Sequence, residues 1–311
     1  MLLTTELNES FQESLFIGSW IITKFQYQYW NGIITPFLSI KQRDSYCYFP
    51  FIGPKHLILS KTLFCTSCFQ PKSETNWIGW CTSCQTKKSN LQFSCILTRA
   101  GDPFGDVCNP SKYALCQDEE FCRKFCQPEY VIYLGHVGTS LKFGITRLHL
   151  GHYSKGYYFR ILDQGFDSAL VFRGLDPLNL ASAQNLEDTV AHYFNIPLSL
   201  TFDNKLQAFT NQKSVLDTEA LHEIASIIED AFPDLALFDL LNFTSDYWWF
   251  HPLFKQNVQL SENISVKRYP SVIAGEILLA KGQLALISCC DVLYWINLYD
   301  LQGRSYYQWE D

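Results

Sequence analysis

The sequence predicts an α+β protein, and three observations support this fold class. Apolar residues make up 47% of the chain and charged residues 18%, which is enough for packed cores and too little charge for disorder. Strand-like runs occupy both ends of the chain, whereas helical periodicity appears in the middle. At 311 residues, two or three domains are expected. We expect an N-terminal β segment, a cysteine-rich zinc-knuckle region, an α/β domain and a C-terminal β domain, covering residues 13–64, 65–128, 129–235 and 252–311.

The N-terminal β segment consists of short runs of β-forming residues. Ile33–Ile40 and His56–Leu63 are two such runs, and the pairs Asn31-Gly32 and Gly53-Pro54 between them are typical of turns. This pattern predicts a small sheet that leads into the cysteines.

The pattern changes at Tyr130. Two strand-like runs, 131–134 and 141–145, are joined by a turn at Gly138, which predicts a β-hairpin. Apolar residues recur at helical spacing over 182–194 and over 217–232, so two amphipathic helices should follow, the second capped by Asp217 or Thr218.

The C-terminal part returns to strand-like runs. Turns are expected at Lys281-Gly282 and at Cys290-Asp291, and a small β-barrel or meander is the natural interpretation. The runs are Val272–Leu279, Gln283–Ser288 and Val292–Leu298.

Charge and hydropathy limit the class of protein. The net charge of −7 argues against a protein that coats nucleic acid through a general positive field, although a local basic face remains open. The N-terminus lacks a basic stretch followed by an apolar run, so no signal peptide is expected. No apolar window approaches the roughly 18 residues that a membrane helix needs. We therefore expect a soluble, cytoplasmic protein.

Twelve cysteines are present, and nine of them fall between Cys65 and Cys126. In a reducing compartment, paired thiols bind metal more often than they form disulfides. Two CxxC pairs, Cys65 with Cys68 and Cys81 with Cys84, are separated by 12 residues. Four thiolates from two tight turns suit tetrahedral Zn²⁺. The alternative, two redox pairs, would require each pair to precede a helix in a βαβ unit, and neither pair does.

A second group of cysteines follows at irregular spacing, namely Cys95, Cys108, Cys116, Cys122 and Cys126. A second four-cysteine zinc site is our preferred interpretation. An iron–sulfur cluster, or thiols that are simply buried as small apolar groups, are the alternatives. Both quartets would be closed to substrate, so the metal should be structural.

The predicted hairpin and the first helix carry groups suited to phosphodiester chemistry. Tyr133, Arg160 and Glu187 offer a phenol, a guanidinium and a metal-binding carboxylate. Residues 127–174 hold five Lys or Arg against three acids, which suits a modest anion site. The alternative is that the tyrosine packs, the arginine is solvated and the glutamate is a helix-surface acid.

Several stretches resemble an uncharacterised family, the domain of unknown function numbered 2797. The resemblance rests on CQDEEFCRKFCQPEYVIYL, KFGITR, FRILDQG, NLED, GEILLAKGQLALI and NLYDLQGR, and it runs from Pro36 to near the C-terminus. The family pattern matches Cys95, Cys108, Cys116 and Cys126, and it leaves Cys122 unmatched.

The middle of that family is similar to the hairpin of GIY-YIG nucleases. Residues 131–133 stand in the place of GIY, and Lys142-Phe143-Gly144 in the place of YIG, with lysine replacing the second tyrosine. The resemblance implies a small GIY-YIG-like α/β core. It also implies Mg²⁺ or Mn²⁺ on the glutamate and a catalytic set made of Tyr133, Lys142, Arg160 and Glu187.

The leading prediction is a zinc-containing protein that binds DNA or RNA and possesses a divalent-metal-dependent phosphodiesterase or nuclease activity. One alternative is a binding module without catalysis, in which Lys142, Arg147 and Arg160 contact phosphates. A protein-interaction scaffold is the other alternative.

Overall fold

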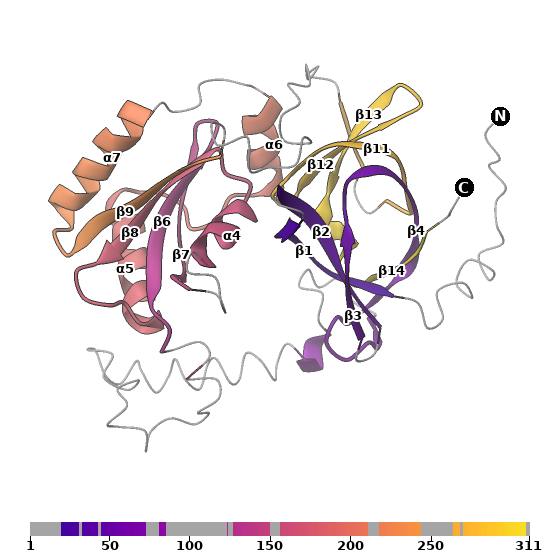
Figure 1. The fold of residues 1–311 in the computed structure, drawn as a ribbon, viewed down its shortest axis with the longest axis horizontal. Helices are drawn as coiled ribbons and strands as arrows, with labels where there is room; N and C mark the ends of the chain where they lie inside the picture. The colour runs from indigo at the N-terminus through magenta and orange to yellow at the C-terminus, as the bar shows by residue number, and fades with distance from the viewer. Residues whose placement is uncertain are drawn as a thin grey trace. The chain divides into compact units, whose positions relative to one another are not determined.

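The computed structural model describes residues 20–30, 33–42, 45–72, 81–84, 123, 127–149, 156–210, 218–243, 264–267 and 270–308. The fold is mixed α+β, as predicted (Figure 1). The chain forms two compact units. Unit 1 combines Met1–Thr86 with Trp248–Asp311, and unit 2 is Lys87–Tyr247.

Unit 1 contains a ten-stranded sheet in the order β10-β13-β12-β11-β4-β14-β1-β2-β3, with β5 paired to β4. The predicted runs in both terminal segments coincide with β2, β4, β11, β12 and β13. The strands are β1 (Ile21–Trp30), β2 (Ile33–Gln42), β3 (Ser45–Pro50), β4 (Gly53–Phe64), β5 (Pro71–Lys72), β10 (Ser265–Lys267), β11 (Val272–Lys281), β12 (Leu284–Cys289), β13 (Val292–Asn297) and β14 (Arg304–Gln308), with a short 3₁₀ helix η6 (Leu298–Leu301) before β14.

Strand pairing joins the two ends of the chain. Strand β4 lies between β11 and β14, so the segments 13–64 and 252–311, expected as separate parts, contribute strands to the same sheet. Leu57 and Leu59 of β4 are buried between these partners. The first cysteine quartet also belongs to this unit, because the boundary falls after Thr86 rather than before Cys65.

Unit 2 contains a four-stranded antiparallel sheet in the order β7-β6-β8-β9, with four described helices. The predicted hairpin and both predicted helices coincide with β6, β7, α5 and α7. Strand β9 extends this unit past residue 235, where the α/β domain was expected to end. The elements are β6 (Tyr130–Val137), β7 (Ser140–Arg147), α4 (Gly156–Leu162), β8 (Ser168–Gly174), α5 (Leu180–Tyr193), α6 (Phe202–Thr210), α7 (Thr218–Ala231) and β9 (Leu235–Asn242).

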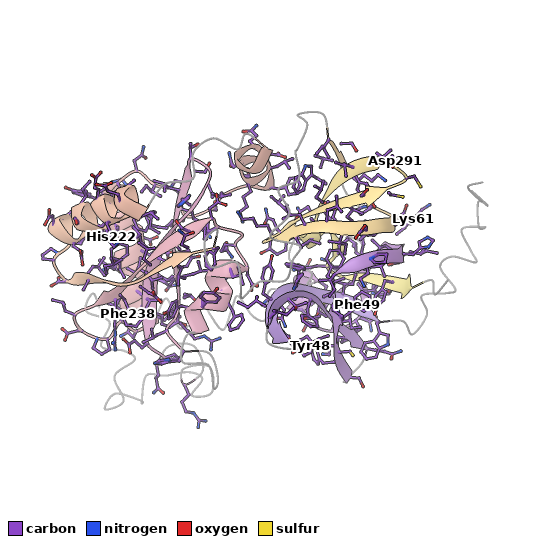
Figure 2. All side chains as sticks on the ribbon, turned by 45° about the horizontal axis from the view of Figure 1, so that its top comes forward. Tyr48, Phe49, Lys61, His222, Phe238 and Asp291 are labelled. Atoms are coloured by element: carbon purple, nitrogen blue, oxygen red, sulfur yellow. The ribbon has the colours of Figure 1, made fainter. Side chains whose placement is uncertain are left out.

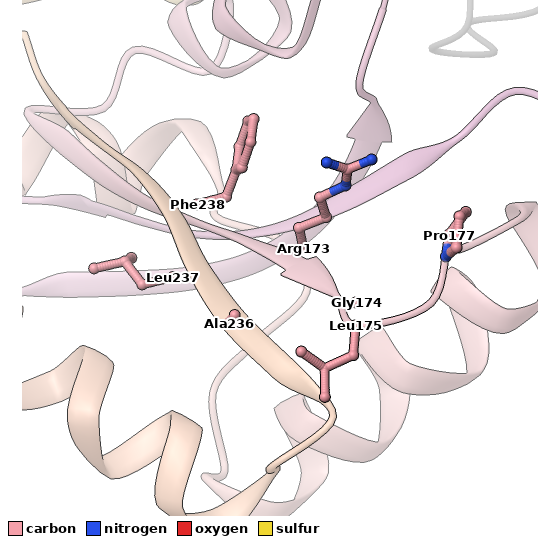
Figure 3. A pocket seen from close by; sticks show the side chains of 7 residues that line it. All are labelled: Arg173, Gly174, Leu175, Pro177, Ala236, Leu237 and Phe238. Carbon is pink, nitrogen blue, oxygen red and sulfur yellow. The ribbon is translucent and has the colours of Figure 1, made fainter.

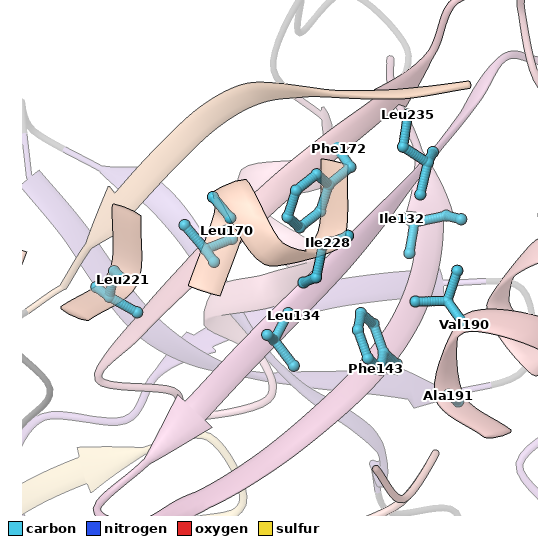
Figure 4. Close-up of a cluster of buried hydrophobic side chains, with 11 residues drawn as sticks. Ile132, Leu134, Phe143, Leu170, Phe172, Val190, Ala191, Leu221, Ile228 and Leu235 are labelled. Carbon is cyan, nitrogen blue, oxygen red and sulfur yellow. The ribbon is translucent and has the colours of Figure 1, made fainter. Parts of the chain in front are cut away.

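One face of the unit 2 sheet packs against α5 and α7 (Figure 4). Side chains of a strand alternate between its two faces. In β6, Ile132 and Leu134 therefore join this core, while Tyr133 points to the opposite face. Lys142 pairs in register with Gly135 and so shares the face of Tyr133. The buried residues of the core are Ile132, Leu134, Phe143, Leu170, Phe172, Val190, Ala191, Leu221, Ala225, Ile228 and Leu235.

Candidate functional site

The first cysteine quartet forms a cluster that could hold a metal ion. The sulfur atoms of Cys65, Cys68, Cys81 and Cys84 all lie within 4.8 Å of one another. The Sγ atoms of Cys68 and Cys81 are 3.7 Å apart. Tetrahedral bonds of about 2.3 Å to one ion would place sulfurs about 3.8 Å apart, so the spacing fits a four-thiolate site. All seven cysteines that the structure describes are free thiols.

The first two cysteines lie in the turn of a short hairpin. Strands β4 and β5 pair at their ends, and the backbone N–H of Cys65 donates to the carbonyl of Gln70 at 2.9 Å. The N–H of Cys68 points at Cys65 Sγ at 3.5 Å. Burial raises the pKa of Cys65, but hydrogen bonds from the backbone N–H groups of Cys68, Cys81 and Ser67 outweigh it and lower the pKa to about 6. The turn therefore favours the thiolate of Cys65. A backbone hydrogen bond from Gln70 lowers the pKa of Cys68, but burial and contacts with the other three thiols outweigh it and raise this pKa.

The second predicted quartet, made of Cys95, Cys108, Cys116 and Cys126, lies outside the described residues. That second metal site therefore stays a prediction.

A second candidate site gathers cationic side chains in unit 2. Lys142 on β7 is 9% exposed and Lys205 on α6 is 5% exposed. Both hydrogen-bond to Gln164: Lys142 Nζ donates to the side-chain oxygen at 2.9 Å, and Lys205 Nζ donates to the backbone carbonyl at 2.8 Å. One residue thus holds two buried ammonium groups close together.

Local structure explains how these groups are held. Gln164 follows α4, where its N–H donates to the carbonyl of Ile161 and the next residue, Gly165, adopts a left-handed φ of +76°. Helix α6 begins after Thr201, whose hydroxyl accepts the N–H of Asn204 at 3.1 Å, and this cap fixes the turn that carries Lys205.

Charge and burial act on both lysines. Burial is the largest cause that lowers the pKa of Lys142, to about 8; Arg160 lowers it further and Glu187 opposes the shift. Burial likewise lowers the pKa of Lys205 to about 7, with further contributions from Lys142 and Arg160. Within the described part of the chain, no carboxylate offsets the shift of Lys205. The site therefore has an excess of positive charge.

Glu187 reaches this site from α5, on the other face of the sheet. Its carboxylate accepts the backbone N–H of Ile145, on β7, which is an edge strand. Burial is the main cause that raises the pKa of Glu187, followed by the charge of Asp188, while Lys142 lowers it. Glu187 thus approaches the cationic face at the outer edge of β7.

The structure brings three of the four predicted catalytic residues into electrostatic contact. Arg160 on α4 and Glu187 on α5 both act on the pKa of Lys142 on β7, and Arg160 is exposed. Tyr133, the fourth, is 2% exposed, and its ring lies 5.9 Å from Lys142 Nζ. Its hydroxyl packs over Gly144, where a Cβ would collide with it. Tyr133 therefore lies beneath Lys142.

Lys205 and Gln164 were not predicted from the sequence. Both belong to segments with no recognisable motif, and a lysine in a helix is usually exposed. The sequence signal that could have indicated a buried lysine is the position of Lys205 on the apolar side of α6, four residues after the capping threonine.

A shallow groove also lies between the end of β8 and the start of β9 (Figure 3). Arg173 in this groove forms an ion pair with Glu129, and its guanidinium lies over the ring of Phe238. This cation is already matched by a carboxylate, unlike those near Gln164. The groove is therefore the weaker candidate for an anion.

Fold and site together define a mixed α+β protein with a four-cysteine cluster that could bind a metal. The chain belongs to the family described as Protein of unknown function (DUF2797), whose model matches residues 55–281, more than half of the sequence. No curated protein and no solved structure matched the chain. None of the helices in the described ranges has the length and apolar character needed to cross a membrane.

Proposed function

We propose that the protein binds nucleic acid at the outer edge of β7 and hydrolyses a phosphodiester there with the help of a divalent metal ion. The observation that carries the proposal is the convergence of Lys142, Arg160 and Lys205 with one carboxylate, Glu187, from four different elements. Three cations against one anion suit a phosphate, because each ammonium or guanidinium donates hydrogen bonds to phosphate oxygens.

Glu187 is the residue that would hold Mg²⁺ or Mn²⁺. One carboxylate fits such ions, which usually take one or two protein carboxylates and complete their shell with water and substrate phosphate. The ion would supply charge neutralisation at the phosphate. Burial raises the pKa of Glu187, and a bound divalent cation would stabilise the carboxylate and lower that pKa again.

Each remaining side chain has a distinct role in this proposal. Arg160 is exposed and contacts the phosphate. Lys142 adds charge from below and, with a pKa of about 8, is suited to proton transfer. Tyr133 is buried, so it positions Lys142 through the contact of its ring with the ammonium rather than reaching the solvent side itself.

The core that carries these residues resembles the GIY-YIG hairpin, and we propose that it is a member of that fold. Support comes from the order of β6, β7, α4 and α5, which presents the four residues in the expected sequence. We further propose that the four-cysteine cluster binds Zn²⁺ and only stabilises unit 1, because four thiolates leave no position open for substrate.

A cleavage assay tests the proposal. The full chain is incubated with single-stranded and duplex DNA and RNA, with Mg²⁺, Mn²⁺ or EDTA. We expect metal-dependent cleavage that Glu187→Ala and Glu187→Gln abolish and that Glu223→Gln, an exposed acid on α7, retains. Cleavage that persists in both Glu187 variants would contradict the assignment of the metal to Glu187.

A binding module without catalysis is the second candidate. It is favoured by Lys142, because a lysine in the place of the second tyrosine adds phosphate affinity but removes a phenol. In that case no substrate is cleaved, yet binding is salt-sensitive and weakens in Lys142→Met and Arg160→Met. If neither cleavage nor salt-sensitive binding occurs, the scaffold alternative stands.

A further inference from the structure

The segment of the sequence that carries strands β1 to β4 and the cysteine turn is basic in an acidic chain. Between Trp20 and Lys72 the sequence contains one acid, Asp44, against six basic residues, while the whole chain has a net charge of −7. The basic residues are Lys24, Lys41, Arg43, Lys55, Lys61 and Lys72. Such a local excess is the electrostatic signature of a surface that meets a polyanion.

Aromatic rings lie on the outer strand of this region. Strand β3 is at the edge of the sheet, and its Tyr46 is 60% and its Tyr48 is 51% exposed. The two tyrosines are two residues apart, so they project from the same face of the strand. Tyr48 is labelled on this strand in Figure 2. Large exposed rings side by side are unusual on a protein surface.

Lys41 connects the tyrosines to the cysteine turn. Its ammonium lies 4.9 Å from the ring centre of Tyr46 and 4.8 Å from that of Phe69. Phe69 follows Cys68 directly and has a left-handed φ of +62°, which is unfavourable for a bulky residue. Its N–H donates to the carbonyl of Cys65 at 2.8 Å, so the turn itself holds the ring beside Lys41. The metal-binding turn and β3 therefore present one continuous surface.

We propose that this surface, formed by Tyr46, Tyr48, Lys41 and Phe69, binds single-stranded nucleic acid. Bases stack on the two exposed tyrosine rings, and Lys41 contacts the phosphate between them. Stacking with cation contacts is how sequence-tolerant single-strand binding proteins work, and duplexes cannot use it because their bases are already stacked. The surface belongs to unit 1, so the inference does not rest on the phosphodiester site of unit 2.

The other occupant to consider is a β-strand from another protein. Within the described ranges no strand pairs with the outer edge of β3, and such an edge can accept a further strand. Single-stranded nucleic acid is favoured by the excess of basic residues and by the exposed rings, since strand addition requires neither.

Fluorescence anisotropy with the zinc-loaded full chain tests the inference. The probes are fluorescein-labelled dT15, U15 and a 15-base-pair duplex. We expect tighter binding to the single strands. Tyr46→Ala and Tyr48→Ala should each weaken this binding about tenfold, within the range for loss of one stacked base. Tyr48→Phe, which keeps the ring, and Tyr299→Ala, another exposed tyrosine of unit 1, should bind as the wild type does.

Salt dependence identifies the role of Lys41. Loss of one phosphate contact to a single strand reduces the slope of log K against log salt by about 0.7. We expect this reduction in Lys41→Met, whereas Lys61→Met, which removes an exposed lysine of β4 outside the proposed surface, should keep the wild-type slope. Circular dichroism checks that every variant is folded.

Three results would overturn the inference. The first is wild-type affinity for single strands in folded Tyr46→Ala and Tyr48→Ala. The second is equal loss of duplex binding in both variants. The third is concentration-dependent self-association in sedimentation experiments that the same variants abolish, because it would assign the β3 edge to strand pairing.

Discussion

Lys205 should make the stability of the protein rise with pH, and replacing it by methionine should remove most of that rise. The amine is buried and its pKa is lowered from 10.5 to about 7. Between these values the unfolded chain keeps a proton that the folded chain has lost. Stability therefore increases as pH rises through this window, because the unfolded state binds more protons. Below pH 7 the full cost of the buried charge is present.

The magnitude follows from the two pKa values. With a pKa of about 7 in the folded state and 10.5 in the unfolded state, the contribution of Lys205 changes by about 2 kcal/mol between pH 7 and pH 9, at about 1.4 kcal/mol per pKa unit. The difference in unfolding free energy between wild type and Lys205→Met should therefore shrink or change sign across this range. Methionine keeps a long unbranched side chain like that of lysine.

Urea unfolding followed by circular dichroism at pH 7, 8 and 9 measures the effect. The quantity compared is the difference in unfolding free energy between wild type and variant, so that other titrating groups cancel. Lys61→Met, a substitution of an exposed lysine on β4, is the control and should leave the pH dependence unchanged. If wild type and Lys205→Met run parallel from pH 7 to pH 9, the amine is solvated and the reasoning about the unit 2 site fails.

Three further predictions follow from the same contacts. Gly144→Ala should destabilise the protein by about 1–3 kcal/mol, as overpacking does, because the new methyl group collides with the hydroxyl of Tyr133. Thermal unfolding measures the loss, and Gly138→Ala, which tests turn strain alone, is the comparison. Cys65→Ser should reduce the metal bound to the first quartet, measured as zinc per chain after dialysis, whereas the exposed Cys47→Ser should not. Nucleic-acid binding at the unit 2 site should weaken between pH 7 and pH 9, because deprotonation removes the charge of Lys142, and Lys142→Arg should reduce this dependence.

Local patterns predicted the elements of this fold well. The Gly138 turn between two strand-like runs corresponds to β6 and β7, and the turn at Cys290-Asp291, where both residues have positive φ, joins β12 to β13. Each of these features is encoded within a few residues, by turn chemistry or by apolar spacing.

Long-range pairing was not predictable in the same way. The insertion of β4 between β11 and β14 brings residues 53–64 against residues 272–277 and 304–308. Any two apolar strands satisfy the same local pattern, and their partner is selected by the packing of the whole sheet. No separate run was predicted for β3 for a related reason, because an exposed edge strand needs little apolar alternation.

The candidate site shows the same division. Tyr133, Lys142, Arg160 and Glu187 were identified by their order along the chain, whereas Lys205 and Gln164 were found only through three-dimensional contacts. A resemblance assigns positions, but burial and charge decide what a side chain at that position does. Here burial places Tyr133 beneath the surface, and Lys142 hydrogen-bonds to Gln164.

The lysine at position 142 therefore has a physical rationale of its own. Two buried ammonium groups held by one glutamine destabilise the free protein, since burial favours their neutral forms. An anion that enters beside them restores their ordinary pKa values and recovers that free energy on binding. The free energy lost by burying the two ammonium groups would thus be regained with a doubly charged or polyanionic ligand but not with a neutral one. A phosphodiester site needs this preference whether or not the bond is then cleaved.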